Sequence, residues 1–242
     1  MLMGGELHNQ PTYPQRSFAR VAGLSLLLVV LTGVFTKFFV LGKLVTDDAA
    51  STASNILAHT ELFRLGIVIQ ALSCVSGLVF VWAMYRLLKQ VSEGLALLGL
   101  LGGFTSTLIS VFTLHDSFSV LYLLGAGTEP AAFPALQAQS WAMMLLSHDD
   151  GVLLSMVFFA FGSGLNGWLL FRSRLIPRLL AGWCLLAYLA VFAGMLWIVL
   201  YPAQAPGVLP FVLLPDFLAQ VLLGLWLLAK GTAAQPTTES QL

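Results

Sequence analysis

The sequence predicts an all-α membrane protein, a six-helix transmembrane bundle with both termini cytoplasmic and a long outer loop between helices 3 and 4. Of the 242 residues, 58% are hydrophobic and 9% are charged, whereas about a quarter of a soluble domain is charged. Six apolar runs also reach the roughly 20 residues that a helix needs to cross a bilayer. Because these runs are continuous and do not alternate, they exclude a transmembrane β-barrel.

The six predicted helices occupy the apolar runs in chain order. They are expected at 21–42, 65–88, 95–114, 151–171, 179–200 and 209–229. The first run is too long for a signal peptide and is expected to be an uncleaved signal anchor. The transmembrane domain therefore spans 20–231, between polar cytoplasmic tails at 1–19 and 232–242, and the outer loop covers 117–149.

The basic residues predict the orientation. Eight of the 11 lysines and arginines flank the helices on one side: Arg16, Arg20, Arg86, Lys89, Arg172, Arg174, Arg178 and Lys230. By the positive-inside rule this side faces the cytoplasm, as expected for a multi-pass protein of a bacterial inner membrane. A formal net charge of zero argues against nucleic acid as a partner. The expected partners are membrane lipids and a small lipophilic substrate.

Most acidic residues and histidines fall on the opposite, outer side of the predicted bundle. They are Asp47, Asp48, Glu61, Asp116, Glu129, Asp149, Asp150 and Asp216, with His59, His115 and His148. At 1.5 Å per residue, Arg64, His115 and Asp150 each lie about 33 Å above their cytoplasmic anchors. Ionisable groups at membrane depth are usually paired, face a cavity or carry function. This layer is therefore the first candidate site, and a lipid or small lipophilic molecule bound near the outer leaflet would contact His59, Arg64, Asp116 and Gln220.

A metal site is one hypothesis for this layer. The ligands would be His115, His148 and Asp150, helped by His59, Asp116 or Asp149. Imidazole and carboxylate ligands suit a divalent metal such as zinc, and an open position would let a bound water attack a lipid or amide carbonyl. Against this hypothesis, the histidines come from separate segments and form no His-Glu-x-x-His motif.

A second hypothesis is acid catalysis, with Glu61 and Asp216 as proton donor and acceptor on a lipophilic substrate and His115 beside them. An apolar environment favours the protonated form of a carboxyl group, which general acid catalysis needs. Cyclisation of isoprenoids is one conceivable reaction, by analogy only. The structural alternative is that Glu61 pairs with Arg64 one turn along the helix and carries no chemistry.

A third hypothesis is transport along a polar path. Asp216 and Gln220 lie four residues apart on one face of the last helix, and Asn166 and Gln70 lie inside two other helices. Such groups also join helices by ordinary hydrogen bonds. A non-catalytic assembly role stays open as well. We further expect Asp216 to pair with Lys37, because each is the only formal charge within its apolar run and their expected depths differ by only about 4 Å. The alternative is that Lys37 extends outward to the interface and leaves Asp216 in an apolar setting.

Small residues four apart predict close helix contacts. Gly99-x-x-x-Gly103 and Ser163-x-x-x-Gly167 have the spacing that lets helices approach closely in lipid. Internal packing is the favoured interpretation, and an oligomer formed through these small-residue faces is the alternative.

Several short segments carry a family resemblance. They are Thr52-Ala-Ser-Asn55, Leu62-Phe-Arg-x-Gly66, Tyr85-x-Leu-Leu-Lys89 before Leu95-Ala-Leu-Leu98, Gly162-x-Gly164-x-x-Gly-Trp-Leu-Leu170 before Ser173-x-x-Ile-Pro-Arg178 and Gly182, and Leu225-Trp-Leu-Leu-x-Lys-Gly231. Between Arg20 and Gly231 the chain thus resembles a bacterial multi-pass family catalogued as domain of unknown function 4386. The resemblance implies a membrane-embedded helical fold, and it implies no activity.

Overall fold

The computed structural model describes residues 13–46, 48–123 and 134–231, and these residues form helices and short connections. The α-helices are α1 (Tyr13–Phe35), α2 (Gly42–Leu44), α3 (Ala49–Ala58), α4 (Thr60–Leu88), α5 (Glu93–Leu123), α6 (Pro134–Ser173), α7 (Arg178–Leu200) and α8 (Ala205–Ala229). A π-helix, η1 (Thr36–Leu41), joins α1 to α2, and a 3₁₀-helix, η2 (Pro202–Gln204), joins α7 to α8.

Within the described residues, six stretches of helix are long and apolar enough to cross a membrane, as the sequence predicted. They are Arg16–Leu44, Thr60–Leu88, Glu93–Leu121, Gly151–Ser173, Arg178–Leu200 and Pro202–Ala229. Two helices extend into the segment expected to be an outer loop. Helix α5 continues to Leu123 and α6 begins at Pro134, so only 124–133 of that segment lies outside the described residues. The side chains of 134–150 are likewise outside the description.

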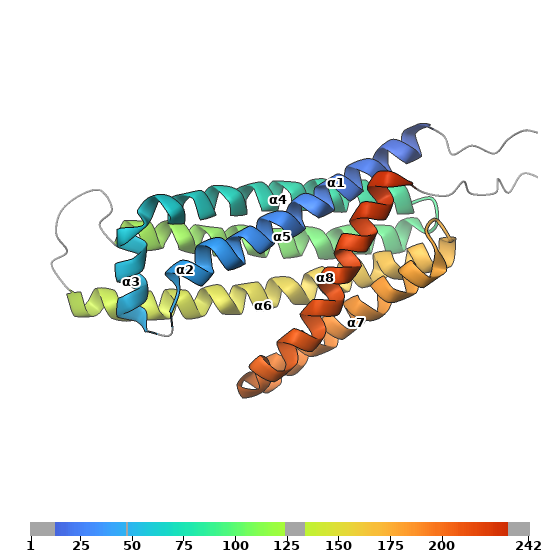
Figure 1. The fold of residues 1–242 in the computed structure, drawn as a ribbon. Helices are drawn as coiled ribbons and strands as arrows, with labels where there is room; N and C mark the ends of the chain where they lie inside the picture. The colour runs from blue at the N-terminus through green and yellow to red at the C-terminus, as the bar shows by residue number, and fades with distance from the viewer. Residues whose placement is uncertain (1–12, 47, 124–133, 232–242) are drawn as a thin grey trace, which may run out of the picture.

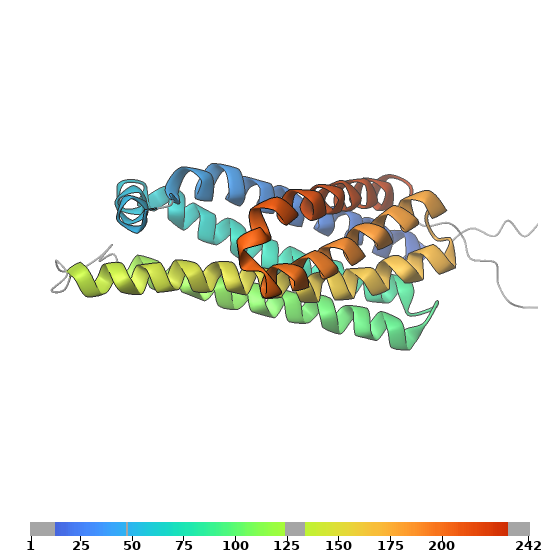
Figure 2. The ribbon, with the colours of Figure 1, turned by 90° about the horizontal axis from the view of Figure 1, so that it is seen from below.

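The six long helices pack as a closed ring. Helix α1 contacts α4 and α8, and the remaining contacts follow the chain from α4 through α5, α6 and α7 to α8. Figure 1 shows α1, α4, α5 and α6 running side by side, while the α7–α8 hairpin crosses them obliquely. The view from below in Figure 2 shows the same hairpin lying against one side of the bundle.

One end of the bundle collects the start of α1, the end of α8 and the α4–α5 and α6–α7 turns (Figure 1). At this end Arg86 lies over two rings, 4.8 Å from the centroid of Phe18 and 5.9 Å from that of Trp82. Helix α3 lies across the opposite end (Figure 1), where Asp48 caps it by accepting a 2.7 Å hydrogen bond from the backbone N–H of Ser51. The segments that carry the eight basic residues of the predicted cytoplasmic side therefore lie at one end of the fold.

Burial in the bundle is graded from a packed core to an apolar outer surface. The largest cluster of buried side chains lies toward the end with the α4–α5 and α6–α7 turns, and includes Met84, Leu88, Leu169 and Tyr188. Large apolar side chains such as Phe211, which is 81% exposed, point outward. Such a surface is stable in hydrocarbon, so it fits a bundle that is surrounded by lipid.

Glycines allow the closest helix contact, between α5 and α6. A Cβ on Gly162 would lie 2.7 Å from the carbonyl oxygen of Gly99 and 2.8 Å from the backbone nitrogen of Gly103. The backbones of the two helices therefore touch at this point. This is the internal packing that the small-residue spacing favoured.

Candidate functional site

Glu61 and Arg64 lie on the surface at the start of α4. Arg64 Nη1 is 3.8 Å from Glu61 Oε1, and the side chains are 51% and 91% exposed, respectively. His59, the residue between α3 and α4, is also exposed. An exposed ion pair one turn apart on a helix contributes little to stability. This contact is the pairing of Glu61 with Arg64 that was expected as the alternative to acid catalysis by Glu61.

His115 and Asp116 are neighbours in the C-terminal part of α5. His115 Nδ1 is 4.0 Å from Asp116 Oδ1, and the histidine side chain is 77% exposed. The other two predicted metal ligands, His148 and Asp150, lie on α6 among the residues whose side chains are outside the description. Among the side chains that are described, no three or more histidine, cysteine or acidic residues come together as a metal site would need.

Lys37 and Asp216 do not form the expected pair. Among the described residues, Asp216 has no cationic group within ion-pairing distance, and its Oδ2 instead accepts a 2.7 Å hydrogen bond from Nε2 of Gln220. The two side chains line different hollows of the bundle. Depth along the helices was similar in the prediction, but depth alone does not bring two side chains on different helices together.

The residues of the transport hypothesis do come together. Gln70 of α4, Asn166 of α6 and Asp216 and Gln220 of α8 all line one central cavity with a volume of about 260 Å³. Side chains of α1 and α5 complete its wall. Five of the six helices of the ring therefore contribute to the wall of this cavity.

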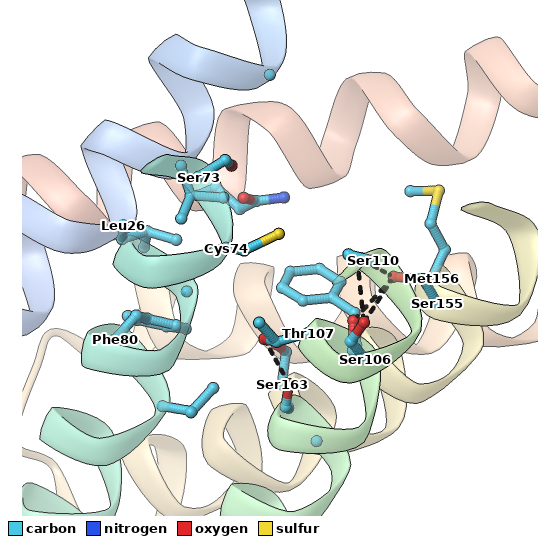
Figure 3. Close-up of a pocket in the computed structure, with 18 of the residues that line it drawn as sticks. Leu26, Ser73, Cys74, Phe80, Ser106, Thr107, Ser110, Ser155, Met156 and Ser163 are labelled. Carbon is cyan, nitrogen blue, oxygen red and sulfur yellow. Dashed lines mark hydrogen bonds between the residues drawn. The ribbon is translucent and has the colours of Figure 1, made fainter. Parts of the chain in front are cut away.

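Hydroxyl groups cover the α5–α6 wall of this central cavity (Figure 3). Ser155 Oγ lies 3.1 Å from Ser106 Oγ and 2.9 Å from Ser110 Oγ. Nearby, Thr107 Oγ1 donates a 2.9 Å hydrogen bond to the carbonyl oxygen of Gly103. These bonds satisfy the hydroxyl groups in place, so the wall is polar and ordered without a ligand.

Two acceptor atoms in the wall of the central cavity have no such partner. Asp216 is 3% exposed and Asn166 is 5% exposed, and Oδ1 of each is buried with no hydrogen-bond donor among the described residues. Gly99 leaves room for the amide, because a Cβ there would lie 2.7 Å from Asn166 Oδ1. A buried acceptor without a donor costs about 1–3 kcal/mol. Proteins usually keep such groups for a reason.

A second cavity of about 250 Å³ adjoins the central one toward the α3 end. Five residues line both cavities: Gly33, Gln70, Ser110, Ser155 and Met156. Lys37 lines only the second cavity, next to Thr36, whose buried hydroxyl oxygen has no partner among the described residues. We call the two cavities together the polar channel of the bundle, and Lys37 and Asp216 lie in its two halves.

The sequence analysis missed the contribution of α5 to this channel. Ser106, Ser110, Thr113 and Ser117 line it at intervals of four, three and four residues. That spacing places hydroxyl groups along one face of a helix, so the polar stripe was visible in the sequence. Hydroxyl groups carry no formal charge, so a site prediction based on ionisable residues does not include them.

One family model matches most of the chain. The match covers residues 21–231, and the family is described as Domain of unknown function (DUF4386). No curated protein matches the chain, and no solved structure matches it. The match extends over most of the chain and includes every helix of the ring. The chain belongs to the DUF4386 family.

Proposed function

We propose that this protein binds a small polar solute with a protonated amine in the central cavity, as a carrier in a bacterial inner membrane. The observation that carries the proposal is the pair of unbonded acceptors, Asp216 Oδ1 and Asn166 Oδ1, in the wall of one cavity. Both atoms need a donor, and one of them belongs to a carboxyl group. An ammonium group supplies several N–H donors together with the opposite charge.

The size and lining of the central cavity support a small ligand. Its volume of about 260 Å³ lies near the lower end of the range of ligand pockets, about 300–1,000 Å³. Apolar side chains such as Leu26 and Phe159 share the wall with the polar groups. A ligand of a few heavy atoms with one cationic end fits this combination.

The geometry supports the alternative functions less well. Glu61, Arg64 and His115, on which the outer-leaflet and catalytic hypotheses depend, are exposed and line neither cavity. Glu61 therefore does not share a cavity with Asp216, and the two carboxyl groups are not arranged as an acid–base pair.

The proposal includes the orientation of the protein in the bacterial inner membrane. The end of the bundle with Arg86, Arg174 and Lys230 would face the cytoplasm, as the positive-inside rule requires, and both chain termini would lie there. Lys37 and the second cavity would then lie toward the outer face. A solute would reach Asp216 from outside by way of this second cavity.

The test is ligand-induced thermal stabilisation of the full-length protein in mild detergent at pH 7. Butylammonium is the probe, and 1-butanol is its neutral counterpart. We expect butylammonium to raise the Tm of the wild type, because a ligand that binds only the folded state stabilises it in proportion to ln(1 + [L]/Kd). 1-Butanol should give no comparable rise.

Two variants make the test specific. Asp216→Asn keeps the shape of the side chain and removes its charge, so the stabilisation by butylammonium should disappear. Asp116→Asn is the matched control, since Asp116 lies on α5 and lines neither cavity. The proposal is wrong if butylammonium does not stabilise the wild type, or if Asp216→Asn responds as strongly as the control.

A further inference from the structure

The polar channel carries one formal charge of each sign. Among the described residues that line the central cavity, Asp216 is the only charged one. Among those that line the second cavity, only Lys37 is charged. Neither has an opposite charge within 4.0 Å among the described ion pairs. Both groups are therefore available to a ligand.

Uncharged polar side chains lie between the two charges. Gln70, Ser110 and Ser155 belong to the walls of both cavities. Met156 and Gly33 complete the shared wall, and Gly33 adds no side chain. Gly33 is exposed, and a Cβ there would meet no atom within 4 Å, so α1 leaves open space beside the wall that the two cavities share.

The backbone around Lys37 is itself unusual. Lys37 lies in the π-helix η1, and the backbone N–H of Gly42 donates to its carbonyl oxygen, five residues earlier. A single π turn inside a long helix is rare and frequently marks a functional site, because the additional residue changes which side chains face the interior. The buried hydroxyl of Thr36 in the same turn lacks a partner among the described residues. The π turn thus sets a cation beside a free hydroxyl group in the wall of the second cavity.

From these observations we infer that the polar channel binds a zwitterionic solute, with its ammonium group at Asp216 and Asn166 and its carboxylate at Lys37 and Thr36. The inference rests on the proposed function and names its substrate class. Amino acids and other small amino-carboxylates have this chemistry. Binding both ends would pair the charge of Asp216, which is 3% exposed and costly to leave unpaired, and would also give a counter-charge to Lys37, which is exposed but lines the second cavity.

A simple cation would satisfy only one half of this arrangement. It would leave Lys37 without a counter-charge, although Lys37 is the only formal charge within the apolar part of the first transmembrane span. A simple anion would leave Asp216 unpaired in the same way. The zwitterion is the ligand class that uses both.

The experiment compares amino-carboxylates of increasing length with ligands of single charge. Glycine, 4-aminobutyrate and 6-aminohexanoate are titrated against the full-length protein in mild detergent, with butylammonium and butyrate as single-charge probes, and each apparent Kd is taken from the rise in Tm. We expect at least one amino-carboxylate to bind about tenfold more tightly than butylammonium, since it adds a second charge-assisted contact.

Variants of Lys37 assign the second contact. Lys37→Met should reduce the affinity for the best amino-carboxylate to the level of butylammonium and leave butylammonium binding unchanged. Lys37→Arg, which keeps the charge, should retain most of the tighter binding and shows that the loss in Lys37→Met is not a folding defect. Lys43→Met is the control, because Lys43 lines neither cavity.

The outcomes separate the two proposals. If butylammonium binds as tightly as every amino-carboxylate, or if Lys37→Met changes nothing, the zwitterion inference is overturned and the amine site at Asp216 stands. If butylammonium fails to stabilise the wild type, the proposed function fails, and the inference that rests on it fails as well. If an amino-carboxylate binds more tightly than butylammonium, and this binding depends on both Lys37 and Asp216, the proposed function and the zwitterion inference are both supported.

Discussion

Gln220 and Asp216 lie one turn apart on α8, and Gln220 Nε2 donates a 2.7 Å hydrogen bond to Asp216 Oδ2. Within the described residues this is the only hydrogen bond that a side chain makes to the carboxyl group, and it leaves Oδ1 unbonded. Pro215, which precedes Asp216, has no backbone N–H and interrupts the hydrogen bonding of the helix at this point. Gln220 therefore orients the carboxyl group so that one oxygen is held and the other stays free for a ligand.

Replacement of Gln220 by leucine should destabilise the protein. The substitution leaves both oxygens of a 3%-exposed carboxyl group without a donor among the described side chains. We expect a loss of about 1–3 kcal/mol, measured as a lower Tm in mild detergent. Gln204→Leu is the control, because the bond between Gln204 and Trp197 is exposed. Equal losses in the two variants would contradict a special role for the buried bond.

Filling the passage between the cavities should block binding without unfolding the protein. Gly33 lines both cavities and a Cβ there meets nothing within 4 Å, so Gly33→Leu should fold normally and add a side chain at the wall that the two cavities share. We expect the wild-type Tm and no stabilisation by 4-aminobutyrate. Gly207→Leu is the control, because Gly207 is also open and lines neither cavity. Undiminished stabilisation of Gly33→Leu by 4-aminobutyrate would argue against a ligand that spans both halves.

Gly162→Ala should separate α5 from α6. The new methyl group would lie 2.7 Å from the carbonyl oxygen of Gly99, and backbone atoms cannot move aside as a flexible side chain can. Overpacking of this kind costs about 1–3 kcal/mol, so the Tm should fall. Gly164→Ala, on the same helix with nothing within 4 Å of the new Cβ, should instead gain up to about 1 kcal/mol from helix propensity. Equal changes in Tm for the two variants would show that the close contact between α5 and α6 does not limit the stability of the protein.

Cysteine labelling tests the proposed orientation. Ser51→Cys on α3 and Gly94→Cys at the start of α5 lie at opposite ends of the bundle, and both positions are exposed. A membrane-impermeant maleimide should label Ser51→Cys in intact spheroplasts and Gly94→Cys only after permeabilisation. The native thiols give little background, since Cys74 and Cys184 are 7% and 0% exposed. The reverse pattern would invert the orientation and with it the side from which a solute enters.

The sequence by itself determined the helical class and the six spans. A bilayer supplies no hydrogen bonds to the backbone, so a long apolar run has to form a helix, and its length alone identifies a span. The polar residues of the transport hypothesis were also visible, because Gln70, Asn166, Asp216 and Gln220 interrupt apolar runs. Heights along each helix followed from a constant rise per residue.

The tertiary structure alone decided which of these side chains meet. The rise per residue fixes how deep a residue lies, but the direction in which it faces depends on how each helix is rotated and crossed against its neighbours. Lys37 and Asp216 have similar predicted depths and still line separate cavities, whereas Asn166 and Asp216 line the same one. The π turn at Lys37 changes the direction in which that side chain points, and the regular 3.6-residue period of a helix does not predict this change. The unbonded acceptors, on which the proposed function depends, arise because helix packing buries them beside one cavity where the described residues provide no donor.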